Sequence, residues 1–167
     1  MVIPADRIPM SPDVRFDLIK KISVCENGTE QLDSHVVDEC LNFLSWSKSC
    51  HVFATLSPYP GNLNPYYAEY IRNEKTYDND LIILPLCNGR HFYGYIVDKV
   101  NKKIVFIDSL YKEKSGRRAI SKVLKERFFP RESSEVVRFY PFPVQYDGHS
   151  CGGWLVFGMI YYAFCQL

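Results

Sequence analysis

Apolar residues first recur at helical spacing from Asp33 onward. Asp33 or Ser34 can cap the first turn of a helix, because a short polar side chain there accepts from unpaired backbone N–H groups. The apolar residues expected on one helical face are Val36, Val37, Cys40, Leu41 and Leu44. The segment is therefore predicted to form an amphipathic helix packed on a core.

Three apolar runs follow, at Leu81 to Leu86, Phe92 to Val97 and Ile104 to Ile107. The first two are separated by Asn-Gly-Arg at 88–90, and the last two by a polar stretch at 99–103. Short apolar runs bounded by such turn residues are typical of strands. We expect three consecutive strands joined by tight turns.

The remaining pattern predicts two helices and a further strand. Ser115 to Phe129 has helical periodicity and is ended by Pro130, whereas Val136 to Tyr140 is expected to be a strand before a Pro-Phe-Pro break. A last, apolar helix opens at or just after Cys151. The fold class is α+β: a small, mostly antiparallel sheet with one central helix and flanking helices.

The composition indicates one domain without a dominant charge. The 167 residues are 47% apolar, which suffices for a core, and 20 basic against 19 acidic residues give a net charge of +1. No nucleic-acid or membrane partner is expected from so balanced a charge. The densest basic stretch, Lys112 to Arg131, is interpreted as a solvated helix face, with a nucleic-acid patch as the alternative. Residues 1–30 are expected to be loosely structured.

The cysteines favour a reducing compartment and no metal. Six cysteines lie without a C-x-x-C pair or regular spacing, at positions 25, 40, 50, 87, 151 and 165. Since no secretory signal is visible, we expect reduced thiols in an intracellular protein of the nucleus or cytoplasm. Residues 151–167 carry no charge, which raises a membrane anchor as an alternative, but 17 residues suit a buried core helix better.

His91 and Asp108 are candidates for an acid–base pair. His91 begins one predicted strand and Asp108 ends the next. If these strands are hairpin neighbours, their far ends meet, and the carboxylate can orient the imidazole. The alternative is an edge histidine and a turn aspartate of no chemical role.

Cys151 decides between these interpretations, because it lies at a predicted helix N-terminus. There the helix dipole and free N–H groups lower a thiol pKa. Gly148, Gly152 and Gly153 leave room for a substrate backbone to approach the sulfur. Gln145, six residues earlier, is a candidate for an oxyanion hole together with the Cys151 backbone N–H. The other five cysteines are interpreted as core residues.

Two nearby residues are weaker candidates. His149 is interpreted as a loop residue that shapes the site, because a base must approach the thiol from across the cleft. Asp147 could replace Asp108 as the acid, but only by reaching His91 across the loop.

In this order, His91, Asp108, Gln145 and Cys151 resemble the catalytic set of the ubiquitin-like-protein-specific (SUMO/NEDD8-type) cysteine proteases, an arrangement shared by the adenoviral proteinase. The Gln-x-x-x-x-x-Cys-Gly motif and the His-aromatic pair carry the resemblance. A further likeness begins at Leu32-Asp33. The resemblance therefore runs from about residue 30 to the end and implies a papain-like or adenain-like fold, with a protease domain at 31–167.

The chain also departs from this family's pattern. Phe92 and Gln31 stand where the family has the two tryptophans of its Gly-Gly tunnel, and are thus the positions expected to contact substrate, with Gly152. Ser34 replaces an Asp of the helix start. The family continues beyond the nucleophile helix, so the chain is expected to be a fragment or a shortened member.

The resemblance implies a cofactor-free thiol protease, acting as a monomer on a ubiquitin-like modifier or its conjugates at the modifier's C-terminal glycine. Three alternatives stay open: a viral- or transposon-type polyprotein-processing protease, an acetyltransferase with the same triad, and a non-catalytic domain that binds a modifier. Intact His91, Asp108 and Cys151 argue against the last.

Overall fold

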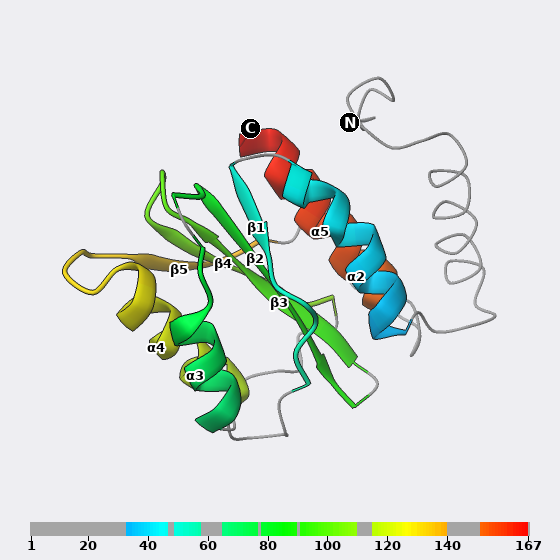
Figure 1. Ribbon diagram of the computed structural model, residues 1–167, viewed down its shortest axis with the longest axis horizontal. Helices are drawn as coiled ribbons and strands as arrows, with labels where there is room; N and C mark the ends of the chain where they lie inside the picture. The colour runs from blue at the N-terminus through cyan, green and yellow to red at the C-terminus, as the bar shows by residue number, and fades with distance from the viewer. Residues whose placement is uncertain are drawn as a thin grey trace.

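A computed structural model describes residues 33–46, 49–57, 65–76, 78–89, 91–109, 115–139 and 151–166 (Figure 1). The helices are α2 (Ser34–Asn42), the 3₁₀ helix η2 (Phe43–Trp46), α3 (Pro65–Asn73), α4 (Ser115–Phe128) and α5 (Cys151–Gln166). The strands are β1 (Cys50–Val52), β2 (Leu81–Asn88), β3 (His91–Asp98), β4 (Lys103–Ile107) and β5 (Glu135–Arg138).

The strands form one five-stranded sheet in the order β1-β2-β3-β4-β5. The two central pairs are antiparallel, as expected for strands joined by tight turns. β1 and β5 instead join the sheet in parallel with β2 and β4. The expected α+β class with a mostly antiparallel sheet is confirmed, since the long central strands pair antiparallel. The short outer strands can pair in parallel because helices α3 and α4 separate these partners in sequence and permit crossovers.

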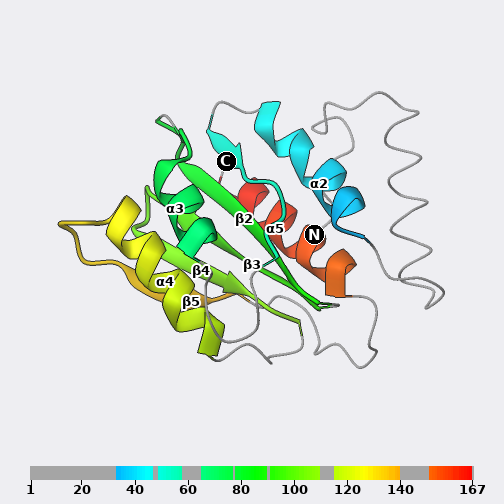
Figure 2. The same ribbon diagram turned by 60° about the horizontal axis from the view of Figure 1, so that its bottom comes forward.

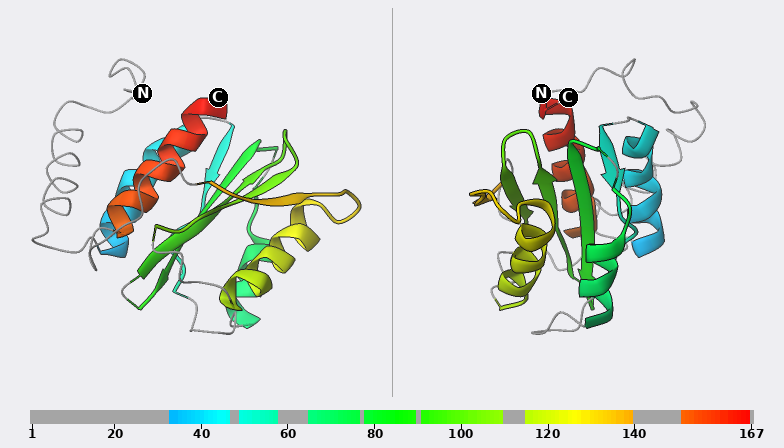
Figure 3. Two further views of the ribbon diagram at one scale, coloured as in Figure 1. Left: turned by 180° about the vertical axis from the view of Figure 1, so that it is seen from behind. Right: turned by 60° about the vertical axis from the view of Figure 1, so that its left-hand side comes forward.

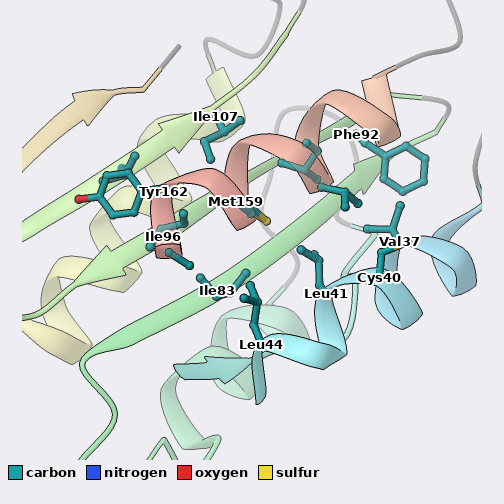
Figure 4. Packing of buried hydrophobic residues seen from close by; sticks show 14 of the residues in the cluster. Val37, Cys40, Leu41, Leu44, Ile83, Phe92, Ile96, Ile107, Met159 and Tyr162 are labelled. Atoms are coloured by element: carbon teal, nitrogen blue, oxygen red, sulfur yellow. The ribbon is translucent and has the colours of Figure 1, made fainter. Parts of the chain in front are cut away.

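Helices cover both faces of the sheet. In Figures 1 and 3, α2 and α5 lie on one face, and α3 and α4 lie on the other. Each face has its own buried cluster, and Figure 4 shows the one beneath α2 and α5. This arrangement explains the near-continuous apolar runs of β2 and β3, whose residues are buried on both sides.

Local sequence sets the ends of these elements. The Oδ1 of Asp33 accepts from the backbone N–H of Val36 at 2.9 Å, which caps α2 as predicted. Gly89 has φ of 65° in the β2–β3 turn, a conformation that glycine adopts without strain. At the β3–β4 turn, the Asp98 carboxylate accepts from the backbone N–H and the side chain of Asn101.

The outer elements differ most from the prediction. The pattern predicts neither β1 nor α3. β5 begins at Glu135 rather than at Val136 and ends at Arg138, and the predicted end of this strand, Tyr140, lies outside the described residues. The predicted central helix is α5, which packs on β3 and begins at Cys151. No helix in the described part of the chain has both the length and the apolar character needed to cross a membrane.

Candidate active site

His91 and Asp108 meet at one end of the central hairpin. His91 opens β3, and Asp108 directly follows β4, the antiparallel neighbour of β3. The Nε2 of His91 lies 2.7 Å from Oδ1 of Asp108. The Asp108 side chain is fully buried, whereas His91 keeps 14% of its side chain exposed. The carboxylate can therefore orient an imidazole that still reaches solvent.

Cys151 is the first residue of α5, and its sulfur lies against the start of β3. The backbone N–H of Phe92 donates to Cys151 Sγ at 3.4 Å, so the sulfur lies against the residue that follows His91. The backbone N–H of Gly152 also contributes a hydrogen bond to this sulfur. One amide donor from β3 and one from the N-terminus of α5 favour the thiolate form.

The pKa of the Cys151 thiol is lowered and the pKa of the His91 imidazole is raised. Burial alone would raise the pKa of Cys151, but His91 and the Phe92 and Gly152 N–H groups outweigh burial and lower it. Burial alone would lower the pKa of His91, but its interactions with Asp108 and Cys151 raise it to about 9. Both shifts favour the thiolate–imidazolium pair over the neutral thiol and imidazole.

The second imidazole nitrogen is left for the thiol. Nδ1 of His91 is buried and has no partner in hydrogen-bond geometry among the described residues. Because Nε2 is taken by Asp108, Nδ1 is the atom that can exchange a proton with Cys151 or with a substrate group.

Two other buried thiols show the opposite pKa shift. Burial, and then the charge of Asp80, raises the pKa of Cys50 to about 11. Burial, and then the charge of Cys151, raises the pKa of Cys87. Both belong to the buried cluster under α5, as expected for core cysteines. The same expectation is wrong for Cys165, which is exposed near the end of α5. A thiolate is therefore favoured at Cys151 and disfavoured at Cys50 and Cys87.

Sequence reasoning missed the aromatic support of the imidazole. The Tyr93 ring stacks on the His91 ring with centroids 6.0 Å apart and planes 13° apart, and Tyr93 is buried. Residues two apart on a strand point to the same face. The order His91-Phe92-Tyr93 in a predicted strand therefore indicated that the tyrosine ring lies beside the imidazole. Tyr93 restricts the rotation of the ring that faces Cys151.

The remaining predicted site residues are placed only in part. Phe92 is 3% exposed, and its ring lies in the buried cluster shown in Figure 4. Gly152 is buried in the first turn of α5. Gln31 and Gln145 lie outside the described residues, as do Asp147 and His149. Within the described residues, no group of three or more His, Cys, Asp or Glu side chains could hold a metal ion.

Several solved structures share this fold. The C-terminal Ulp1 protease domain in complex with Smt3, the yeast ortholog of SUMO, superposes with a TM-score of 0.65 at 15% identity, covering 95% of this chain and 87% of that chain. The Ulp1-like SUMO protease catalytic domain of Chaetomium thermophilum gives 0.59 at 15% identity, with 93% and 79% covered. The Chlamydia trachomatis effector protein ChlaDUB1 gives 0.60 at 14% identity, with 100% and 85% covered.

Sequence comparison identifies the family. None of the curated proteins compared with the chain matches it. The family model described as "Ulp1 protease family, C-terminal catalytic domain" matches residues 31–166, which is most of the chain. The chain therefore belongs to the Ulp1 family of cysteine proteases.

Proposed function

We propose that Cys151 is the nucleophile of a thiol protease that cleaves the peptide or isopeptide bond after the C-terminal glycine of a ubiquitin-like modifier. One observation carries this proposal: an imidazole held 2.7 Å from the buried carboxylate of Asp108 lies beside a thiol whose pKa is lowered. This is the constellation that thiol-mediated acyl transfer requires.

The reaction assigns one role to each group. The Cys151 thiolate attacks the glycine carbonyl carbon and forms a carbon–sulfur bond. The His91 imidazolium gives its proton to the leaving amine as the carbon–nitrogen bond breaks. Water then attacks the thioester with His91 as base, which releases the modifier's carboxylate and the thiol. The Cys151 N–H and the Gln145 amide are proposed to stabilise the oxyanion.

Family membership and one structural relative support the substrate class. The Ulp1 domain that shares this fold was solved in complex with Smt3, the yeast ortholog of SUMO. We propose a modifier of this type as the partner, recognised at its C-terminal tail near Phe92, Gly152 and Gln31. We also propose that the enzyme works in the nucleus or cytoplasm, where thiols stay reduced.

The polyprotein-processing alternative differs in the substrate and not in the chemistry. Phe92 stands where the family's tunnel has tryptophan, and its ring is buried in the core cluster. A smaller aromatic residue at this position alters the wall that would contact a Gly-Gly tail. The two functions therefore differ in the substrate that reaches Cys151, and probes with different modifiers distinguish them.

The test is covalent labelling with SUMO, NEDD8 and ubiquitin that carry an electrophile at the C-terminus. The native chain is expected to form an adduct with one of them, and Cys151→Ala is expected to form none. Cys165→Ala is the matched control, because Cys165 is an exposed free thiol far along the same helix. It should label like the native chain.

Each other outcome has a definite meaning. Labelling that persists in Cys151→Ala would contradict the assignment of the nucleophile. Fast, Cys151-dependent reaction with iodoacetamide but with no modifier probe would keep the thiol protease and remove the modifier as substrate. Slow reaction with both, from folded protein, would favour a domain that binds without cleaving.

A further inference from the structure

A cavity lies between α4 and β5, on the face of the sheet opposite the one that α5 and Cys151 cover. Its volume is about 410 Å³, within the range of small-molecule sites. The residues that line it are Arg118, Ser121, Lys122, Lys125, Glu126 and Val136. α4 lies on the face of the sheet opposite α5, so this cavity is separate from the thiol site (Figure 2).

Ser121 supplies an unpaired hydroxyl to this cavity. The residue is 9% exposed, and its Oγ is buried without a hydrogen-bond partner among the described residues. Buried hydroxyl groups in proteins nearly always have a partner, in the protein or in a bound molecule. Because Ser121 lines the cavity, a ligand there can supply the missing partner.

The charged residues around Ser121 leave an excess of positive charge. Glu126 is engaged by Lys122 at 3.9 Å and by Arg72 at 3.5 Å. Arg118 and Lys125 have no ion-pair partner in the described part of the chain. Arg118, Lys122 and Lys125 recur at helical spacing on α4 and share its cavity-facing side. The cavity therefore favours an anion.

We propose that this cavity binds the phosphate group of a small phosphomonoester. A guanidinium, two ammonium groups and a hydroxyl are donors that suit the tetrahedral oxygens of phosphate, and the arginine fork can contact two oxygens at once. The cavity is larger than the phosphate group needs, and Val136 offers an apolar wall to the organic part of the ester. The basic stretch predicted to be a solvated face thus includes a binding site.

The experiment titrates the native protein with phenyl phosphate at constant ionic strength, with binding followed by calorimetry. Saturable binding is expected. Ser121→Ala should weaken it at least about tenfold, because a hydrogen bond to a charged group is lost. Arg118→Gln combined with Lys125→Gln should abolish it. Lys75→Gln is the matched control: Lys75 is exposed and outside the cavity, so binding should not change.

Three results would overturn the proposal. The first is no saturable binding by the native protein. The second is equal weakening in Lys75→Gln, which would indicate general charge attraction. The third is a fall in the melting temperature of ligand-free Ser121→Ala, because losing an unpaired hydroxyl should not destabilise the fold. The rate of Cys151 labelling in Ser121→Ala should match that of the native chain, since the two sites lie on opposite faces.

Discussion

The Nε2 of His91 and the Oδ1 of Asp108 lie 2.7 Å apart, although 17 positions separate the two residues in the chain. The β3–β4 hairpin closes this distance, because its antiparallel strands bring the start of one beside the end of the other. The contact fixes which imidazole nitrogen faces the carboxylate. It also leaves Nδ1 for the chemistry at Cys151.

Asp108→Asn should keep the shape of this contact and remove its charge. An amide can hold the wrong tautomer and does not stabilise the imidazolium, so we expect kcat/KM to fall by about 10³-fold or more. The measurement is hydrolysis of the modifier identified by probe labelling, fused to a fluorogenic leaving group. Asp78→Asn, at an exposed position, is the control and should retain full activity. Equal activity of both variants would remove Asp108 from the mechanism.

The pH dependence of kcat/KM should be bell-shaped. The acid limb should lie below the ordinary thiol pKa of 9.0, because the Cys151 pKa is lowered. The alkaline limb should fall near pH 9, where His91 loses its proton. The thiolate–imidazolium pair is populated between these limits.

The same shifts predict how stability changes with pH. The raised pKa of His91 contributes stability that is complete below 6.5 and is lost as the pH rises through about 9. The lowered pKa of Cys151 contributes stability that is present above 9.0 and is lost as the pH falls through the lowered value. In Cys151→Ala the His91 pKa, measured by NMR, should be lower than in the native chain. An unchanged His91 pKa would contradict the coupling of the two groups.

The sequence was sufficient for the hairpin and for the pairing of His91 with Asp108, because turn residues and apolar runs are local signals. It was insufficient for β1 and α3. β1 has three residues, too few for a periodic pattern, and α3 mixes tyrosines with charged residues and follows a Pro/Gly-rich stretch. Parallel pairing in β1 and β5 depends on crossovers between layers, which no local pattern encodes.

The site, like the fold, was predictable only in part from the sequence. The order of His91, Asp108 and Cys151 carried the family resemblance, but the neighbours that tune them required the register. Phe92 pairs with Cys87 across β2 and β3 and so places a second thiol near Cys151. Cys87 and Cys151 cannot be told apart by residue type. Burial raises the pKa of Cys87, whereas His91 and two backbone N–H donors lower the pKa of Cys151.

Tyr162→Phe should destabilise the fold without touching the site. The Tyr162 hydroxyl donates to Asp98 Oδ2 at 2.7 Å, which ties α5 to the end of β3, and Asp98 is 1% exposed. Losing this donor leaves a buried carboxylate with fewer partners, at a cost of about 2 kcal/mol in the free energy of unfolding. Urea unfolding measures the change. Tyr161→Phe is the control, since the half-buried Tyr161 ring stacks on Phe139, and it should cost less than about 0.5 kcal/mol.

Gly94→Ala should damage both stability and activity, because Gly94 is where β3 approaches α5. A Cβ there would lie 2.7 Å from the Leu84 carbonyl oxygen and 2.3 Å from Met159 Cε. The methionine end can move, but the backbone of β2 cannot without disturbing the sheet. We expect a loss of about 1–3 kcal/mol in urea unfolding, and slower probe labelling as α5 and Cys151 shift away from Phe92.

Gly89 differs from Gly94, because substitution at Gly89 is limited by the backbone conformation and not by neighbouring atoms. Among the described residues, nothing lies within 4 Å of a Cβ at Gly89, but its φ of 65° disfavours most side chains. Asparagine tolerates this conformation, so Gly89→Asn should lose less than about 1 kcal/mol. Gly94→Asn should unfold more readily than Gly94→Ala, since a larger side chain meets the same carbonyl. If Gly94→Ala were as stable and as reactive as the native chain, the close packing of α5 on β3 would not be what positions Cys151.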